Sequence, residues 1–180
     1  WRISWGAARQ KTSSSASTAL TLYVAPFRQE HNTDWDQIGV DVTVLAAGGA
    51  FKIAIYADTA GTPGGLVWAS GDLSSVTTSL KTLAFSAGTW SDTSYQNGSN
   101  LRIKPGQSVF ITLLTNNTTA SFRWIAVGGA RQLRHSGATG ANAVFTRYTS
   151  TYVSYATQNP IASALTAGSG VVPQFVLRAA

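Results

Sequence analysis

The chain has 180 residues, a net charge of +6 and neither cysteine nor methionine. A chain of this length can bury one sizeable core, and the missing cysteines exclude a disulfide framework and thiolate metal sites. The sequence has no run of about 18 apolar residues and no charged start followed by an apolar stretch, which excludes a membrane-spanning helix and a signal peptide in this segment.

The N-terminal region does not resemble a packed domain. The chain starts at Trp1 without a methionine, so we expect a processed or excised piece of a longer protein whose partner segment lies upstream. Residues Gln10 to Thr18 form a polar Ser/Thr tract that is typical of a linker. We therefore expect residues 1–18 to be an N-terminal segment and linker, and residues 19–180 to be one domain.

Apolar residues recur with a period of two along most of the chain, and no window has the helical spacing i, i+3, i+4, i+7 over three turns. Period-two runs place apolar side chains on one face of a strand. Eight such runs predict strands: Leu20–Val24, Ile38–Val44, Phe51–Ile55, Leu83–Phe85, Leu101–Ile103, Val109–Leu113, Phe122–Ala126 and Phe175–Leu177.

The connections between these runs have turn chemistry. Asn97-Gly98 favours positive φ, and Pro105-Gly106 interrupts the chain before a strand. The runs Val109–Ile111 and Trp124–Val127 are apolar on both faces, which suits central strands of a sandwich or a face buried between subunits. We predict an all-β, two-sheet antiparallel sandwich, jelly-roll-like, with these residues buried: Ile38, Val40, Val42, Ile53, Ile55, Ile111, Leu113 and Trp124. Lys52, Asp41 and Arg123 should lie on the opposite faces of their strands.

The stretch from Gly128 to Pro173 does not follow the strand pattern. It is rich in Gly, Ser, Thr, Ala and Tyr, and only Ala143–Phe145 and Tyr152-Val153 indicate short strands. Loop excursions of this length in a compact domain are usually functional or disordered. We expect a long C-terminal loop excursion from the sandwich.

Residues Ile53 to Val67 resemble a pattern found in sandwich domains of bacteriophage tail-fibre and related virion proteins. In that pattern a strand ending in an apolar-Tyr pair is followed by an Asp-x-x-Gly-x-Pro-Gly loop. Here Asp58 could hydrogen-bond the following amides, Pro63 fixes φ, and Gly61 and Gly64 permit backbone angles closed to other residues. The flanking strands and the closing Pro173–Leu177 segment agree with the pattern.

The resemblance implies a virion-surface domain, often trimeric, that meets the host. It covers about Leu20 to Trp124 together with the C-terminal strand. It supplies no catalytic residues that could be carried over to this chain.

Charge is divided unequally between the halves of the chain. All seven acidic residues precede Thr93, and the residues from Thr93 onward carry seven basic side chains. A field of one sign indicates an anionic partner, such as an acidic polysaccharide, lipopolysaccharide phosphates or nucleic acid. The alternative is a solvated surface whose acids happen to come early in the sequence.

Catalytic patterns are weak. The chain has no Gly-x-Ser-x-Gly elbow and no phosphate-binding loop, and His31 and His135 are its only histidines. Asp34 and Asp36 could form a carboxylate pair or, with Glu30 and His31, bind a divalent metal, but turn capping explains them better. We expect no catalytic residues, no metal and no cofactor.

Aromatic and basic residues are the better candidates for binding. A ring face stacks on the C–H face of a sugar, and guanidinium groups bind anions. A subunit interface is the alternative, because Tyr and Arg are enriched there as well. The predicted ligand-binding residues are Arg131, Arg134, His135, Arg147, Tyr148, Tyr152, Tyr155, Trp90 and Tyr95.

From these observations we expect a non-catalytic virion-surface domain that recognises an anionic bacterial envelope glycan, such as lipopolysaccharide or capsule. We further expect a homotrimer located on a tail or surface fibre, attached to other virion proteins through the upstream part. Neither membrane insertion nor nucleic-acid binding is expected. The alternatives are a structural virion assembly module, such as a capsid fibre or tail adaptor, and a carbohydrate-binding or adhesin module of a secreted bacterial protein.

Overall fold

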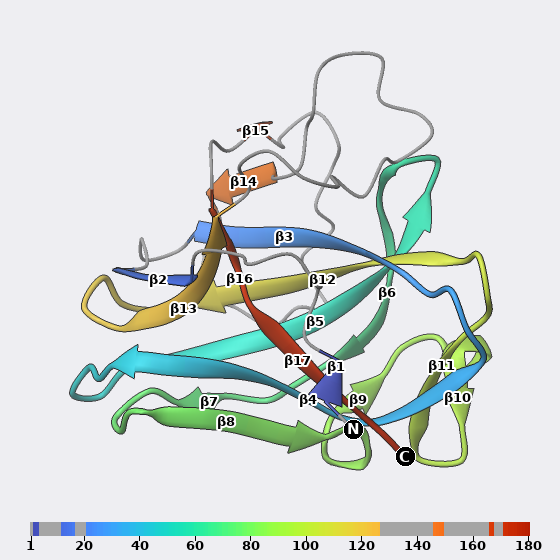
Figure 1. The fold of residues 1–180 in the computed structure, drawn as a ribbon, viewed down its shortest axis with the longest axis horizontal. Helices are drawn as coiled ribbons and strands as arrows, with labels where there is room; N and C mark the ends of the chain where they lie inside the picture. The colour runs from blue at the N-terminus through green and yellow to red at the C-terminus, as the bar shows by residue number, and fades with distance from the viewer. Residues whose placement is uncertain (1, 4–11, 17–20, 127–145, 150–165, 168–170) are drawn as a thin grey trace.

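A computed structural model describes the backbone of residues 2–3, 12–16, 21–126, 146–149, 166–167 and 171–180, and the side chains of 22–123 and 173–180. These residues form two antiparallel β-sheets and two short 3₁₀ helices, η1 (Phe85–Ala87) and η2 (Thr93–Tyr95) (Figure 1). Their apolar inner faces pack against each other, which confirms the predicted two-sheet antiparallel sandwich. Within this part of the chain, no helix is long and apolar enough to span a membrane.

Sheet A is built around the twelve-residue strand β4. Strands β17, β8, β11 and β13 all pair with β4, and the shorter strands extend the sheet from these partners. Its members are β1 (Arg2–Ile3), β2 (Thr12–Ala16), β4 (Thr33–Val44), β8 (Ser79–Ala84), β10 (Gln96–Asn97), β11 (Asn100–Ile103), β13 (Ser121–Ala126), β16 (Val171–Pro173) and β17 (Phe175–Ala179).

Sheet B has β12 at its centre, paired with β3 on one side and β5 on the other. Its strand order is β15-β14-β3-β12-β5-β6-β9, and β7 pairs with β5. Its members are β3 (Thr21–Arg28), β5 (Ala50–Thr59), β6 (Thr62–Ala69), β7 (Leu73–Ser74), β9 (Thr89–Trp90), β12 (Ser108–Thr115), β14 (Thr146–Thr149) and β15 (Thr166–Ala167).

The main core lies between the two sheets. Seven of the residues predicted to be buried have no exposed surface in the structure: Ile38, Val40, Val42, Ile53, Ile55, Ile111 and Leu113. The eighth, Trp124, has its backbone in β13 but its side chain lies outside the described residues. Asp41 and Arg123 lie on the opposite faces of their strands, where they pair with each other, and Lys52 turns away from the core toward Asp72.

A second buried cluster lies on the other face of sheet B. It contains Leu22, Val24, Ala54, Tyr56, Phe110 and Leu114. The residues of β12 from Val109 to Thr115 are therefore buried on both faces within a single chain. The two-sided apolar run in this strand does not require a neighbouring subunit to cover it.

The segment that carries the resemblance forms the β5–β6 hairpin. The amide of Gly61 donates a hydrogen bond of 2.8 Å to Oδ1 of Asp58, as predicted. Ala60 and Gly61 both have positive φ, of 50° and 92°. The prediction for Gly64 is wrong, because its φ lies outside the left-handed region. The reason for glycine there is steric, since a Cβ would lie 2.0 Å from Oγ1 of Thr59.

All eight predicted strands are present. The structure also contains strands that were not predicted, among them β6, and it differs from the predictions in three further places. Phe85 begins η1 instead of ending β8. The tract predicted to be a linker contains β2, because its backbone pairs with β13 over Thr12–Ala16. Within the predicted excursion, the described residues include the short strands β14, β15 and β16, whereas the runs Ala143–Phe145 and Tyr152-Val153 lie outside the described residues.

Candidate binding surface

Three aspartates on the outer face of β4 each bind an arginine from a different neighbouring strand. Asp41 accepts a hydrogen bond of 2.7 Å from Nε of Arg123 on β13. Asp34 binds Arg102 on β11, and Asp36 binds Arg178 on β17. We call these three contacts the Asp–Arg pairs of sheet A. They arise because β4 supplies the acids and the strands that pair with it supply the bases.

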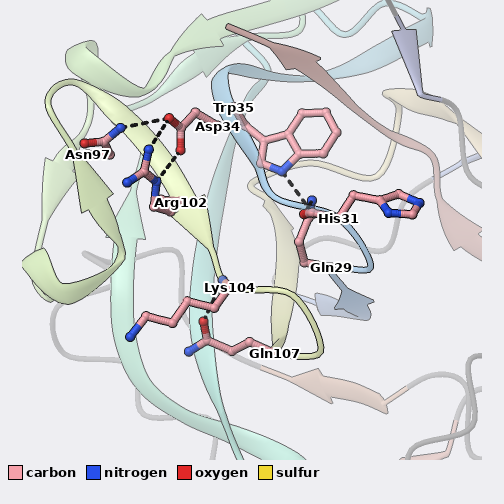
Figure 2. A network of polar contacts seen from close by, with 8 residues as sticks. All are labelled: Gln29, His31, Asp34, Trp35, Asn97, Arg102, Lys104 and Gln107. Atoms are coloured by element: carbon pink, nitrogen blue, oxygen red, sulfur yellow. Dashed lines mark hydrogen bonds and ion pairs between the residues drawn. The ribbon is translucent and has the colours of Figure 1, made fainter.

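The Asp34 carboxylate binds side chains from two strands, β10 and β11 (Figure 2). Arg102 donates to it in a bidentate manner, with 2.7 Å from Nε to Oδ1 and 2.7 Å from Nη2 to Oδ2. Asn97 adds a third hydrogen bond of 2.8 Å to Oδ2. The hydrogen bond from Arg102 lowers the pKa of Asp34 below its ordinary value of 3.8, against an opposing effect of burial.

The pKa of Asp36 is lowered in the same way, and the lowered pKa values bear on whether these aspartates could act in catalysis. The hydrogen bonds from Arg178 lower the pKa of Asp36, so both carboxylates are held in the ionised form. A general acid needs a raised pKa, and both carboxylates already have cationic partners. Their arrangement is that of structural ion pairs. The described residues contain no group of three or more His, Asp or Glu side chains that could hold a metal ion.

The Asp–Arg pairs change how the unequal charge distribution should be interpreted. Three of the seven basic residues after Thr93 neutralise acids from the first half of the chain. The basic residues of that half outside these pairs are Lys104, Arg131, Arg134 and Arg147. Three of these four belong to one stretch of seventeen residues, 131–147. The basic residues of the second half that lie outside the Asp–Arg pairs are therefore concentrated, along the sequence, in this stretch.

The two candidate aromatic residues with described side chains belong mainly to the core. Tyr95 in η2 is only 8% exposed, and burial raises the pKa of its phenol, with a smaller contribution from the charge of Asp92. Trp90 is half-buried on β9, and its ring lies 6.1 Å from that of Phe85. Little of Tyr95 is accessible for stacking on a sugar, and Trp90 offers only part of its ring.

Two of the remaining seven candidates lie in β14. The backbones of Arg147 and Tyr148 are in β14, at positions that pair with Tyr23 and Leu22 of β3. This pairing attaches the predicted excursion to the edge of sheet B next to β3. The other five candidates, Arg131, Arg134, His135, Tyr152 and Tyr155, lie outside the described residues.

One surface was not predicted from the sequence. Val44, Leu45 and Val76 are the large apolar side chains that the described part of the chain exposes, at 44%, 49% and 44%. Val44 ends β4, Leu45 lies in the β4–β5 connection and Val76 lies in the β7–β8 connection. A backbone hydrogen bond from Ala46 to Ser75 joins the two connections. The available sequence signal was an aliphatic pair at the end of a strand, directly before the Ala-Ala-Gly-Gly turn.

No family model matches the sequence, and a comparison with curated proteins gives no match.

Proposed function

We propose that this chain is a non-catalytic binding domain of a virion surface fibre that recognises an anionic bacterial envelope glycan. One observation carries the proposal: the Asp–Arg pairs engage Arg102, Arg123 and Arg178, and three of the four other basic residues of the second half lie in residues 131–147. The hydrogen bond between Gly61 and Asp58 lies in the loop that resembles the tail-fibre pattern, and this resemblance supports the virion assignment.

The chemistry of the 131–155 segment suits charged sugars. Guanidinium groups form bidentate hydrogen bonds with carboxylates and phosphates, and tyrosine rings stack on sugar C–H faces. A desolvated, charge-assisted hydrogen bond contributes on the order of 1.5 to 3 kcal/mol, so the loss of one should weaken binding roughly tenfold or more. Within the proposal the sandwich is jelly-roll-like, needs no cofactor and displays its sites as a homotrimer, which raises weak single-site affinity through multivalency.

The test compares two double variants against a panel of purified lipopolysaccharides and capsular polysaccharides. Arg131→Ala/Arg134→Ala and Tyr152→Ala/Tyr155→Ala should each weaken binding at least tenfold with little change in melting temperature or mass. Arg28→Ala/Lys104→Ala is the matched control, because it also removes two positive charges, from positions exposed elsewhere on the sandwich. If this control weakens binding as much as the arginine variant does, net charge and not a site is responsible.

Two alternatives predict different outcomes. If the arginine or tyrosine variants dissociate the oligomer, these residues are assembly contacts and the chain is a structural virion module. If the wild-type protein binds neutral polysaccharides as well as anionic ones, an adhesin-type carbohydrate-binding module explains it better. Added salt separates the charge-based site from a stacking-based one, since only the former should lose affinity between low and physiological ionic strength.

A further inference from the structure

One end of the sandwich carries no formal charge. It consists of three connections with the strand ends that flank them, residues 43–50, 74–80 and 115–121, and none of these twenty-two residues is Asp, Glu, Lys, Arg or His. We call this surface the uncharged end. In Figure 1 the β4–β5, β7–β8 and β12–β13 connections all lie at the left side of the molecule.

The three connections are fixed to one another by backbone hydrogen bonds. The amide of Ala46 donates to the carbonyl of Ser75, and the amide of Ser75 donates to the carbonyl of Gly49, both at 3.0 Å. Asn116 joins the third connection to β5, because its amide donates to the carbonyl of Ala50 and its Oδ1 accepts from the amide of Ala50 at 2.9 Å. These hydrogen bonds preorganise the surface, so little conformational entropy of this surface would be lost when a partner binds.

Packing around Gly49 holds the connections close together. A Cβ at this position would lie 2.4 Å from Oγ of Ser75 and 2.8 Å from Nδ2 of Asn117. Side chains from the second and third connections thus converge on the backbone of the first. The Oγ of Ser75 is fully buried at this junction and has no hydrogen-bond partner among the described residues.

The uncharged end also carries the exposed apolar surface of the described structure. Val44, Leu45 and Val76 are each at least 44% exposed. The charged residues that follow the three connections in sequence are engaged with partners: Arg123 with Asp41, Lys52 with Asp72, and Lys81 with the hydroxyl of Thr77. Exposed apolar side chains on a surface without charge are typical of the centre of a protein interface.

The chemistry of the uncharged end selects among possible partners. None of its residues is aromatic, so it lacks the ring faces on which sugars stack. A charged partner would be desolvated there without a counter-charge. Copies of a chain with a net charge of +6 repel one another, and they can approach most closely through a surface that carries no charge. We propose that the uncharged end binds the same end of another copy of this chain.

Sedimentation velocity over a range of protein concentrations tests this inference. The wild-type protein should self-associate, and Leu45→Asp should weaken association at least tenfold, because a desolvated carboxylate from each copy would then lie in the contact. Ser99→Asp is the matched control. It adds the same charge to an exposed position in the β10–β11 turn, away from the uncharged end in Figure 1, and should leave association within about twofold. Leu45→Ser, which adds no charge, should give an intermediate loss.

Salt gives a second readout that separates this surface from the proposed glycan site. Screening reduces the repulsion between copies of like charge, so self-association should strengthen with added salt, whereas binding of an anionic glycan should weaken. The inference is overturned if the wild-type protein is monomeric at several hundred micromolar in high salt, or if Leu45→Asp associates as strongly as Ser99→Asp. Neither result would affect glycan binding by the 131–155 segment.

Discussion

Arg178 binds the carboxylate of Asp36 at the point where β4 bulges. The register between β17 and β4 passes from Arg178↔Gln37 to Ala179↔Trp35, so Asp36 is the additional residue on β4. The bulge explains why Trp35 and Ile38 are both buried although they are three residues apart. In a regular strand of period two, one of them would face solvent. The ion pair therefore lies at the irregularity that allows both side chains to enter the core.

The first prediction concerns acid stability. The folded-state pKa values of Asp34 and Asp36 are lowered by Arg102 and Arg178, so their stabilising contribution is complete above the ordinary value of 3.8 and is lost as pH falls through the lowered values. Asp34→Asn/Asp36→Asn should reduce the free energy of unfolding at pH 6. Urea denaturation at successive pH values should show the difference from wild type narrowing below about pH 4. A difference that stays constant down to pH 2 would contradict this assignment.

The second prediction concerns Gly88. A Cβ at this position would lie 2.3 Å from the indole of Trp68, which is fully buried and held by a 2.9 Å hydrogen bond from its Nε1 to the carbonyl of Phe85. Because neither ring nor backbone can move freely, Gly88→Ala should destabilise the fold by about 1–3 kcal/mol. At Gly65 a Cβ would meet nothing within 4 Å. Chemical denaturation should find Gly65→Ala close to wild type, and equal effects at both positions would refute the steric argument.

The third prediction compares two serines that accept backbone hydrogen bonds. Oγ of Ser70 accepts a bond of 2.8 Å from the buried amide of Ile53, whereas Oγ of Ser74 accepts one of 3.3 Å from the exposed amide of Val76. Ser70→Ala leaves a buried donor unsatisfied and should cost about 1–3 kcal/mol, while water can replace Ser74. Thermal unfolding of the two alanine variants measures the contrast. Ser74→Ala should lower the melting temperature far less.

The fourth prediction is the native mass. The resemblance to tail-fibre domains leads us to expect a trimer, so light scattering at micromolar concentration should give three times the chain mass of 18.9 kDa. Both faces of β12 are buried within one chain. The two-sided apolar run of that strand is therefore no longer a reason to expect a trimer. A stable monomer would rule the trimer out, and a dimer would show that copies meet in pairs.

The strands of the core could be predicted because burial imposes a period of two on their sequences. Ile38, Val40 and Val42 alternate with polar or small residues, and all three are buried. Strand β6 could not be found in this way. Pro63, Gly64 and Gly65 indicate a turn, yet the register of β6 with β5 begins at Thr59↔Thr62, because the actual turn is only Ala60-Gly61.

The candidate site was less predictable than the fold, because local sequence patterns do not reveal which distant strands pair with each other. The division of charge along the sequence indicates one basic half, whereas in space Asp34, Asp36 and Asp41 each lie against an arginine of that half. The polar character of the tract around β2 is typical of a linker, but backbone hydrogen bonds to β13 do not depend on side-chain type. Aromatic residues beside a predicted loop indicate exposure, and Tyr95 is nevertheless buried.

The central position of β4 in sheet A has a consequence for synthesis of the chain. Its partners come from residues 79–84, 100–103, 121–126 and 175–179. The strand that pairs with β4 first in chain order, β8, and the one that pairs last, β17, are therefore far apart in the sequence. Contacts this distant in sequence fold slowly, on the order of milliseconds to seconds. During translation, the edge of β4 that β17 occupies stays open until residues 175–179 have been made, and over that interval it can pair with strands from neighbouring nascent chains.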